Sequence, residues 1–141
     1  SKKNNLKISY LNKSPEQLIT KEKFDIILNL EIVEHVENVD LYLESCKNLI
    51  KQNGIMFTAT LNRTLISYIK AILGAEYILR WLPIGTHDWN KFIKPEELEN
   101  KLTYKNFRTL DISGLNFKPI ANKWKRSNDL SVNYIICSIK N

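Results

Sequence analysis

Continuous apolar runs, separated by segments with helical spacing, dominate the hydrophobic pattern of this chain. FDIILNL, residues 24–30, is apolar along most of its length and is bounded by charged residues. This pattern is typical of a strand buried on both faces of a parallel sheet. IMFTAT, residues 55–60, has the same character. We therefore expect two buried strands at these positions.

The segment between these runs has the spacing of a helix. Within residues 39–51 the apolar positions follow one helical face, as Tyr42, Cys46, Leu49 and Ile50. The Gln-Asn-Gly sequence at residues 52–54 is a common helix stop. The succession of strand, helix, stop and strand predicts a βαβ unit with a right-handed crossover. The chain is therefore expected to have an α/β fold.

Shorter patterns complete the predicted order of elements. Three further β-rich runs predict strands at residues 7–11, 108–114 and 131–139. A polar, basic connection separates the last two strands. Pro15 and Pro95 each suit the first turn of a helix, so we expect a short helical turn after Ser14 and a helix over residues 94–102.

Residues 64–82 are helical in composition but apolar nearly all round. The half of this helix that carries Lys70, Glu76 and Arg80 also carries large apolar side chains. A helix of this kind needs a second apolar partner, and Gly74 is a point at which it can break. The segment is too short and too charged for a comfortable transmembrane span.

Length, composition and charge narrow the class of protein. The 141 residues fit a single domain, and 43% hydrophobic with 26% charged residues is the balance of a globular protein. The net charge of +6 favours an anionic partner, but the lysines are scattered and we expect no nucleic-acid binding. Cys46 and Cys137 are far apart and are expected to be buried thiols. With no signal-peptide pattern at the start of the chain, these features favour the cytoplasm.

Two carboxylates and an imidazole follow directly after the strand predicted at residues 24–30. Glu31, Glu34 and His35 would share one face if a helical turn began at Glu31. This end of a parallel strand is where open α/β sheets bind ligands. The three groups suit a divalent cation, or His35 could accept a proton from a substrate hydroxyl. The other interpretation is an exposed first turn of a helix in which His35 bonds to a backbone carbonyl.

A second polar cluster, His87 and Asp88, lies beside Trp89 in a predicted loop. These residues fit a functional site, and they equally fit ordinary turn chemistry. The sequence leaves both interpretations open.

Three stretches together resemble one family. FDIILNLEIVEHV at residues 24–36, TLNR ending at Arg63, and GAEYILRWLPIGTHDWNKFIKPEEL at residues 74–98 are similar to the ubiquinone-biosynthesis O-methyltransferases. These enzymes methylate polyprenyl catechol and demethylubiquinol hydroxyls with S-adenosylmethionine. The resemblance implies a class I methyltransferase fold, a Rossmann-like α/β sheet of seven strands with helices on both faces and an antiparallel last strand. This chain would supply strands three to seven as one domain, residues 1–141.

The resemblance also implies roles for individual residues. Leu30 would touch S-adenosylmethionine through its backbone. Glu31, Glu34 and His35 match an acidic-histidine motif proposed to hold Mg²⁺ near the catechol, and His35 or His87 would help to remove the hydroxyl proton. Residues 62–93 would form a lid or membrane-contact insertion, in which residues 65–82 touch membrane lipid. We therefore expect a peripheral protein at the cytoplasmic face of the inner membrane.

One departure from the family pattern concerns the cofactor half of the site. Family members carry a Gly-rich turn after the first strand and an acidic residue after the second, both upstream of the stretches matched here. The glycines of this chain form no G-x-G arrangement. The strand at residues 24–30 would then have an unpaired edge. We expect an N-terminal half on another chain, a second copy of this chain, or sequence absent from it to cover that edge.

The sequence therefore predicts the C-terminal part of an S-adenosylmethionine-dependent O-methyltransferase of ubiquinone biosynthesis that acts on a polyprenyl phenol or quinol. Alone, the chain is expected to be inactive and to bind the cofactor poorly or not at all. The alternative is a catalytically inactive remnant that binds lipid or a protein partner through residues 65–82.

Overall fold

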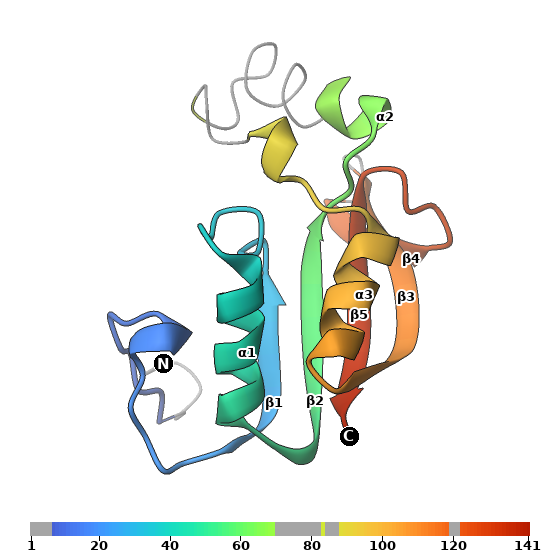
Figure 1. The fold of residues 1–141 in the computed structure, drawn as a ribbon. Helices are drawn as coiled ribbons and strands as arrows, with labels where there is room; N and C mark the ends of the chain where they lie inside the picture. The colour runs from blue at the N-terminus through green and yellow to red at the C-terminus, as the bar shows by residue number, and fades with distance from the viewer. Residues whose placement is uncertain (1–6, 70–82, 84–87, 119–121) are drawn as a thin grey trace.

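A computed structural model describes residues 7–69, 83, 88–118 and 122–141 of the chain. Five strands form one sheet in the order β1-β2-β5-β3-β4 (Figure 1). The strands are β1 (Phe24–Leu30), β2 (Ile50–Leu61), β3 (Phe107–Lys118), β4 (Lys123–Ser127) and β5 (Asn133–Lys140). β1 and β2 run parallel, and every other pairing is antiparallel. The predicted α/β sheet with an antiparallel last strand is confirmed.

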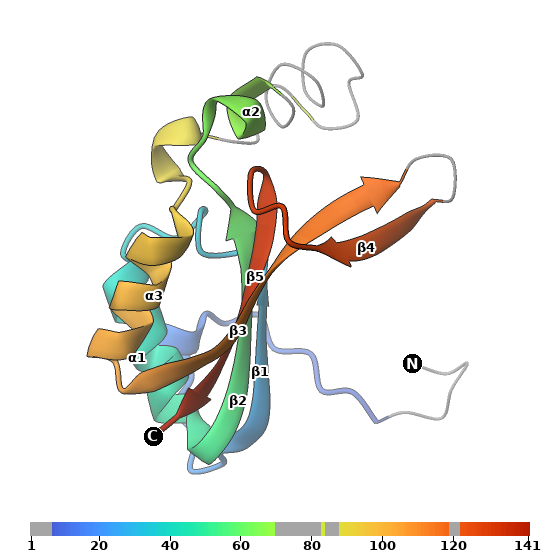
Figure 2. The same ribbon diagram turned by 90° about the vertical axis from the view of Figure 1, so that its right-hand side faces the viewer.

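The described helices differ greatly in length. They are η2 (Pro15–Gln17), α1 (Val39–Leu49), α2 (Leu65–Ser67), η4 (Trp89–Lys91) and α3 (Pro95–Tyr104). Asn38 begins α1, because its side chain accepts a hydrogen bond from the Leu41 backbone N–H and satisfies one free donor of the first turn. Both long helices, α1 and α3, lie on the same face of the sheet (Figure 2). The expected helices on both faces are therefore not what the described residues show.

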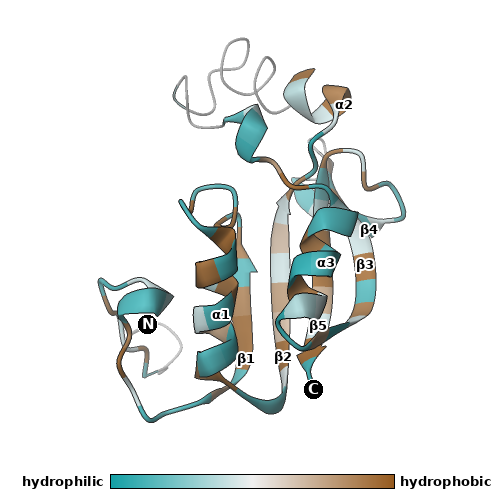
Figure 3. Ribbon diagram, in the orientation of Figure 1, coloured by the Kyte–Doolittle hydropathy of each residue, from teal (hydrophilic) through white to brown (hydrophobic). Residues whose placement is uncertain are grey.

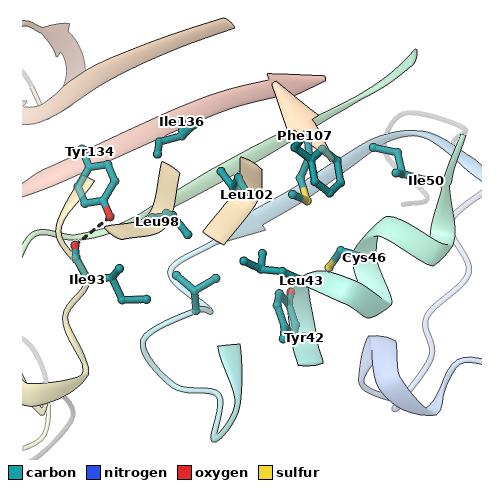
Figure 4. Packing of buried hydrophobic residues seen from close by; sticks show 12 residues of the cluster. Tyr42, Leu43, Cys46, Ile50, Ile93, Leu98, Leu102, Phe107, Tyr134 and Ile136 are labelled. Atoms are coloured by element: carbon teal, nitrogen blue, oxygen red, sulfur yellow. Dashed lines mark hydrogen bonds between the residues drawn. The ribbon is translucent and has the colours of Figure 1, made fainter. Parts of the chain in front are cut away.

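The hydrophobic core lies between this helical layer and the sheet. Leu43 of α1, Leu98 and Leu102 of α3, and Ile136 of β5 are fully buried and belong to one cluster (Figure 4). The helical spacing that predicted α1 therefore corresponds to its packed face. Burial raises the pKa of the Cys46 thiol in this core to about 11, and both cysteines are free thiols.

A polar pair lies inside this apolar layer. Asn29 of β1 is buried, and its Oδ1 accepts a hydrogen bond of 2.9 Å from the Tyr42 hydroxyl of α1. Because buried polar groups are costly unless they are paired, this bond allows the amide to lie in the core. It joins β1 to α1 at one defined position.

The outer face of β1 carries apolar side chains that remain exposed. Ile26, Leu28 and Leu30 are 55%, 58% and 51% exposed, and β1 is an edge strand of the sheet. Figure 3 shows the hydrophobic character of β1 at this edge. The prediction that this strand is buried on both faces is therefore wrong for this chain, whereas the predicted unpaired apolar edge is confirmed.

Several other boundaries differ from the sequence-based predictions. No strand forms at residues 7–11, where the described backbone is irregular. The glycine expected to end the helix at residue 54 lies inside β2, which begins directly after α1. The polar connection predicted after residue 115 instead holds the end of β3 and all of β4. Of the segment 64–82, the structure describes only residues 64–69, so the predicted long helix lies mostly outside the described residues.

Core packing predicts the effect of two matched substitutions in α1. Leu43→Ala removes a fully buried side chain and should lower the free energy of unfolding by about 2–5 kcal/mol. Leu41→Ala makes the same change at a side chain that is 55% exposed, and should change it by no more than about 0.5 kcal/mol. Urea denaturation of both variants measures the difference. Equal effects would contradict the assignment of the core.

Candidate functional site

The candidate site lies where β1 and β2 end. Glu31 directly follows β1, and its backbone N–H donates a hydrogen bond of 2.9 Å to the Ala59 carbonyl oxygen of β2. Glu31 has a φ of 54°, an uncommon left-handed conformation for a residue other than glycine. The β1–β2 ladder thus continues to Glu31, and the chain turns sharply at that residue. Uncommon backbone conformations of this kind concentrate at functional sites.

Glu34 is a buried carboxylate in the loop that follows. It is only 2% exposed, and its Oε2 accepts a hydrogen bond of 2.7 Å from the Thr60 hydroxyl of β2. Its Oε1 has no hydrogen-bond partner among the described residues. Burying a carboxylate oxygen without a partner is costly, so a second group is needed at this position.

The carboxyl groups of Glu31 and Glu34 interact. Partial burial of the Glu31 carboxyl and the charge of Glu34 raise the pKa of Glu31 to about 7, although the residue as a whole is exposed. A proton shared by the pair would give Glu34 the partner it lacks. Either that proton or a cation can therefore satisfy the two carboxylates.

Two residues of β5 close the site from the neighbouring strand. The Asn133 amide donates to Glu31 Oε1 at 3.4 Å, and the Tyr134 hydroxyl donates to the Ile93 carbonyl oxygen at 2.8 Å. Burial, with the charges of Glu34 and Glu97, raises the pKa of Tyr134 far above its usual range. Tyr134 is therefore a neutral hydrogen-bond donor that fixes the segment before α3.

The structure brings together only part of the predicted site. Glu31 and Glu34 lie together, but His35 is exposed, with its backbone N–H bonded to the Ile32 carbonyl oxygen. Among the described residues, no three His, Cys, Asp or Glu side chains are arranged to hold a metal ion. Leu30 lies at the end of β1 with its side chain half exposed, and His87 lies outside the described residues.

Sequence reasoning did not identify Thr60 and Asn133. Thr60 lies near the end of β2, which pairs with β1, and Asn133 is the first residue of β5, which pairs with β2. The one available signal was that neighbouring strands of an open α/β sheet present their ends at a common edge. Without the strand order, that rule could not say which polar residues meet Glu31 and Glu34.

A groove of about 390 Å³ lies nearby, between residues 33–40 and the segment that leads into α3. Its charged side chains are largely paired with one another, Arg63 with Glu97 and Lys101 with Asp40. Neither Glu31 nor Glu34 lines it. The groove is therefore a secondary feature, and the carboxylate pair is the stronger candidate for chemistry.

Sequence comparison finds relatives over the whole chain. A ubiquinone biosynthesis O-methyltransferase from Pelagibacter ubique is 57% identical over 141 residues, which is 100% of this chain and 59% of the relative. Another, from Bartonella bacilliformis, is 51% identical over 132 residues, which is 93% of this chain and 53% of that relative. The chain thus spans little more than half the length of the curated relatives it matches.

Solved structures with a similar fold include methyltransferases. A methyltransferase from Thermotoga maritima that depends on S-adenosylmethionine, described as a possible histamine N-methyltransferase, has a TM-score of 0.67 at 16% identity and covers 93% of this chain and 63% of its own. A methyltransferase from Clostridium acetobutylicum with the same cofactor dependence has a TM-score of 0.65 at 12% identity, covering 99% of this chain and 68% of its own. At such low identity these matches show the fold alone.

One family model has a different description. A model of falstatin, cysteine peptidase inhibitor, matches residues 27–135. That range includes the end of β1 with all of α1 and β2, which form a parallel strand pair joined by a helix. The relatives and the solved structures agree with each other on a methyltransferase, and the inhibitor description differs from both.

The carboxylate pair predicts a pH dependence of stability. Since the pKa of Glu31 is raised to about 7 in the folded chain, its ionisation opposes folding, and stability should fall as the pH rises from about 4.5 through 7. Glu31→Gln should remove this fall and raise the free energy of unfolding at pH 8 by about 1 kcal/mol, a value reduced by solvent screening.

Chemical denaturation at pH 5 and pH 8 measures this effect. Glu37→Gln, a change at an exposed carboxylate three residues beyond Glu34, is the matched control and should leave the pH profile unchanged. If the Glu31→Gln profile matched that of the unmodified chain, the two carboxylates would not be coupled.

Proposed function

Because the chain belongs to the family of ubiquinone biosynthesis O-methyltransferases, we propose that it forms the C-terminal part of an enzyme that transfers a methyl group from S-adenosylmethionine to a phenol or quinol hydroxyl. The assignment rests on 57% identity over the full chain, together with a methyltransferase fold.

The observation that carries the proposal is the carboxylate pair at the ends of β1 and β2. Glu34 is buried with an unpartnered oxygen, and Glu31 lies beside it in a left-handed backbone conformation. Open α/β sheets bind their ligands at this edge. A buried carboxylate beside a second carboxylate costs stability and is better explained by function than by packing.

The two carboxylates fit a divalent cation. Glu31 and Glu34 would hold Mg²⁺ through oxygen atoms, the ligands that this ion prefers, and Glu34 has one oxygen without a partner. Mg²⁺ would lower the pKa of a bound substrate hydroxyl. His35, three residues after Ile32 in the same loop, would be a third ligand only if its exposed side chain turned toward the pair.

Residues of this chain would also accept the proton of the substrate hydroxyl. In the proposed reaction the substrate hydroxyl loses its proton to His35 or His87, and its oxygen then takes the methyl group from the cofactor sulfonium. The uncharged S-adenosylhomocysteine leaves with the sulfur electron pair. The backbone at Leu30 would lie against the cofactor at the open edge of the sheet.

The open edge of β1 indicates that another polypeptide segment pairs with this strand. No strand among the described residues pairs with β1 at that edge, and three large apolar side chains are exposed beside it. The relatives are longer than this chain. We infer that an N-terminal part of the same enzyme adds a strand to β1 and covers its outer face, and that it brings the Gly-rich cofactor turn. A second copy of this chain is the competing occupant.

Residues 65–82 are proposed to contact membrane lipid, where the polyprenyl substrate lies. Within the described part of this segment, Leu65 and Ile69 are 72% and 50% exposed. No helix in the described part of the chain is long and apolar enough to cross a bilayer. An inactive lipid-binding remnant and a cysteine peptidase inhibitor remain the competing functions.

A complementation assay tests the proposed activity. We expect this chain alone to show no methyl transfer, and to gain it when it is co-expressed with the part of the Pelagibacter ubique relative that it does not match. Glu34→Gln should then lower kcat by about 10- to 100-fold through loss of a ligand, as should a chelator, whereas Glu37→Gln should not. Transfer that resists the chelator would remove the metal role.

The same assay distinguishes the competing functions. A reconstituted pair that binds S-adenosylmethionine tightly but transfers no methyl group would favour the inactive remnant. Stoichiometric inhibition of a cysteine peptidase by the chain would favour the inhibitor description.

A substitution on the exposed face of β1 should affect association with the complementing part without affecting folding. Leu28→Lys places a charge on this face, where the side chain is already 58% exposed, and should leave the stability of the isolated chain nearly unchanged. It should weaken association with the complementing part at least tenfold, because a lysine would be buried in the interface without a partner. Leu110→Lys, at a 45% exposed position in β3, is the control. A dimeric mass for the isolated chain would instead favour a second copy.

A further inference from the structure

The β3–β4 hairpin projects away from the rest of the sheet. The last residues of β3 pair with β4, with Phe117 opposite Trp124 and Asn116 opposite Lys125. Figure 2 shows the hairpin leaving the sheet on the side away from α1 and α3. β4 is also the edge strand opposite to β1 in the strand order.

The hairpin combines positive charge with an exposed indole. Lys123, Trp124, Lys125 and Arg126 are consecutive and all exposed, and Trp124 is 61% exposed. Arg126 pairs with Asp111 at 2.9 Å, whereas the two lysines have no carboxylate partner among the described residues. Trp124 packs on Phe117 of the paired strand, yet most of its indole remains exposed.

The base of the hairpin is held firmly, so this exposure is built into the fold. The Arg126 Nε donates to the Ser113 hydroxyl at 2.7 Å, and the Asn116 amide donates to the Ser127 hydroxyl at 3.0 Å. A Cβ at Gly114 would lie 1.8 Å from the Asp129 carbonyl oxygen, so only glycine permits the backbones to approach here. Phe117 and Trp124 contact each other with ring centroids 5.3 Å apart.

The charge and the aromatic residues point to one kind of partner. Lysine and arginine beside a tryptophan are typical of segments that lie at the surface of an anionic bilayer, with the indole at the level of the headgroups. A nucleic-acid groove would need more unpaired cations than the two found here. We propose that the β3–β4 hairpin docks edge-on on an anionic phospholipid bilayer, with Lys123 and Lys125 on one face of β4 and Trp124 on the other.

A second exposed apolar element, α2, is joined to the connection that follows this hairpin. The Thr64 hydroxyl, directly before α2, donates a hydrogen bond of 2.6 Å to the Ser131 carbonyl oxygen in the β4–β5 connection. Leu65 and Ile66 follow at once and are 72% and 48% exposed. The hairpin thus carries charge and an interfacial aromatic residue, and α2 carries exposed apolar side chains. The proposal concerns a second docking surface and does not depend on methyl transfer.

Vesicle co-sedimentation tests the proposal. The chain should bind phosphatidylcholine vesicles that contain phosphatidylglycerol more tightly than vesicles of phosphatidylcholine alone, and high salt should reduce the difference. The double variant K123E/K125E should weaken binding to the anionic vesicles on the order of 25-fold, from about fivefold per lysine. Because both side chains are exposed, its thermal unfolding should be unchanged.

Matched variants make the result specific. K13E/K21E makes the same change in net charge at two exposed lysines far from the hairpin in sequence, and should weaken binding much less. Trp124→Ala should weaken binding, and Trp124→Phe should restore most of it. Equal losses in the two double variants, or no loss in K123E/K125E, would overturn the proposal.

Two further outcomes would also overturn it. The first is loss of binding only in L65S/I66S, which would assign docking to α2 alone. The second is a K123E/K125E variant that binds vesicles normally but no longer binds a single-stranded oligonucleotide. Methyl transfer by the complemented enzyme to a short, water-soluble phenol should be unaffected by K123E/K125E, so a failure of this proposal is distinguishable from a failure of the proposed enzyme.

Discussion

The parallel ladder between β1 and β2 is the constraint on which the rest of the structure depends. Parallel strands cannot be joined by a tight turn, so α1 must cross from one to the other and pack on the sheet. The register places Asn29 opposite Thr58, and the bond from the Glu31 N–H to Ala59 extends it by one residue. That extension brings the loop with Glu34 to Thr60. Core and candidate site therefore follow from one pairing.

The sequence predicted the elements whose evidence is local. The apolar run of β1, the one-sided spacing of α1 and the Pro-Glu-Glu start of α3 each depend on residues within one element. Glu31 and Glu34 were also found from local spacing. His35 was placed with them because the loop was read as a helical turn, whereas Glu31 adopts a left-handed conformation that breaks that geometry.

What could not be predicted depends on contacts between distant segments. Whether the outer face of β1 is covered is a property of its neighbours, since an apolar run looks the same at a sheet centre and at an edge. β4 was read as a connection because its lysines and arginine suit an exposed edge strand as well as a loop. Asn133 lies 102 residues from Glu31 in sequence, and only the strand order brings the two together.

The bond between Tyr42 and Asn29 has a consequence for the uniqueness of the fold. Apolar packing alone would tolerate α1 slid or rotated by one turn along the sheet, since leucine and isoleucine accept many neighbours. Any such arrangement would leave the Asn29 amide and the Tyr42 hydroxyl buried without partners, at a cost of about 1–3 kcal/mol for each group. A single polar contact thus selects one docking position of the helix from a set of arrangements of similar hydrophobic energy.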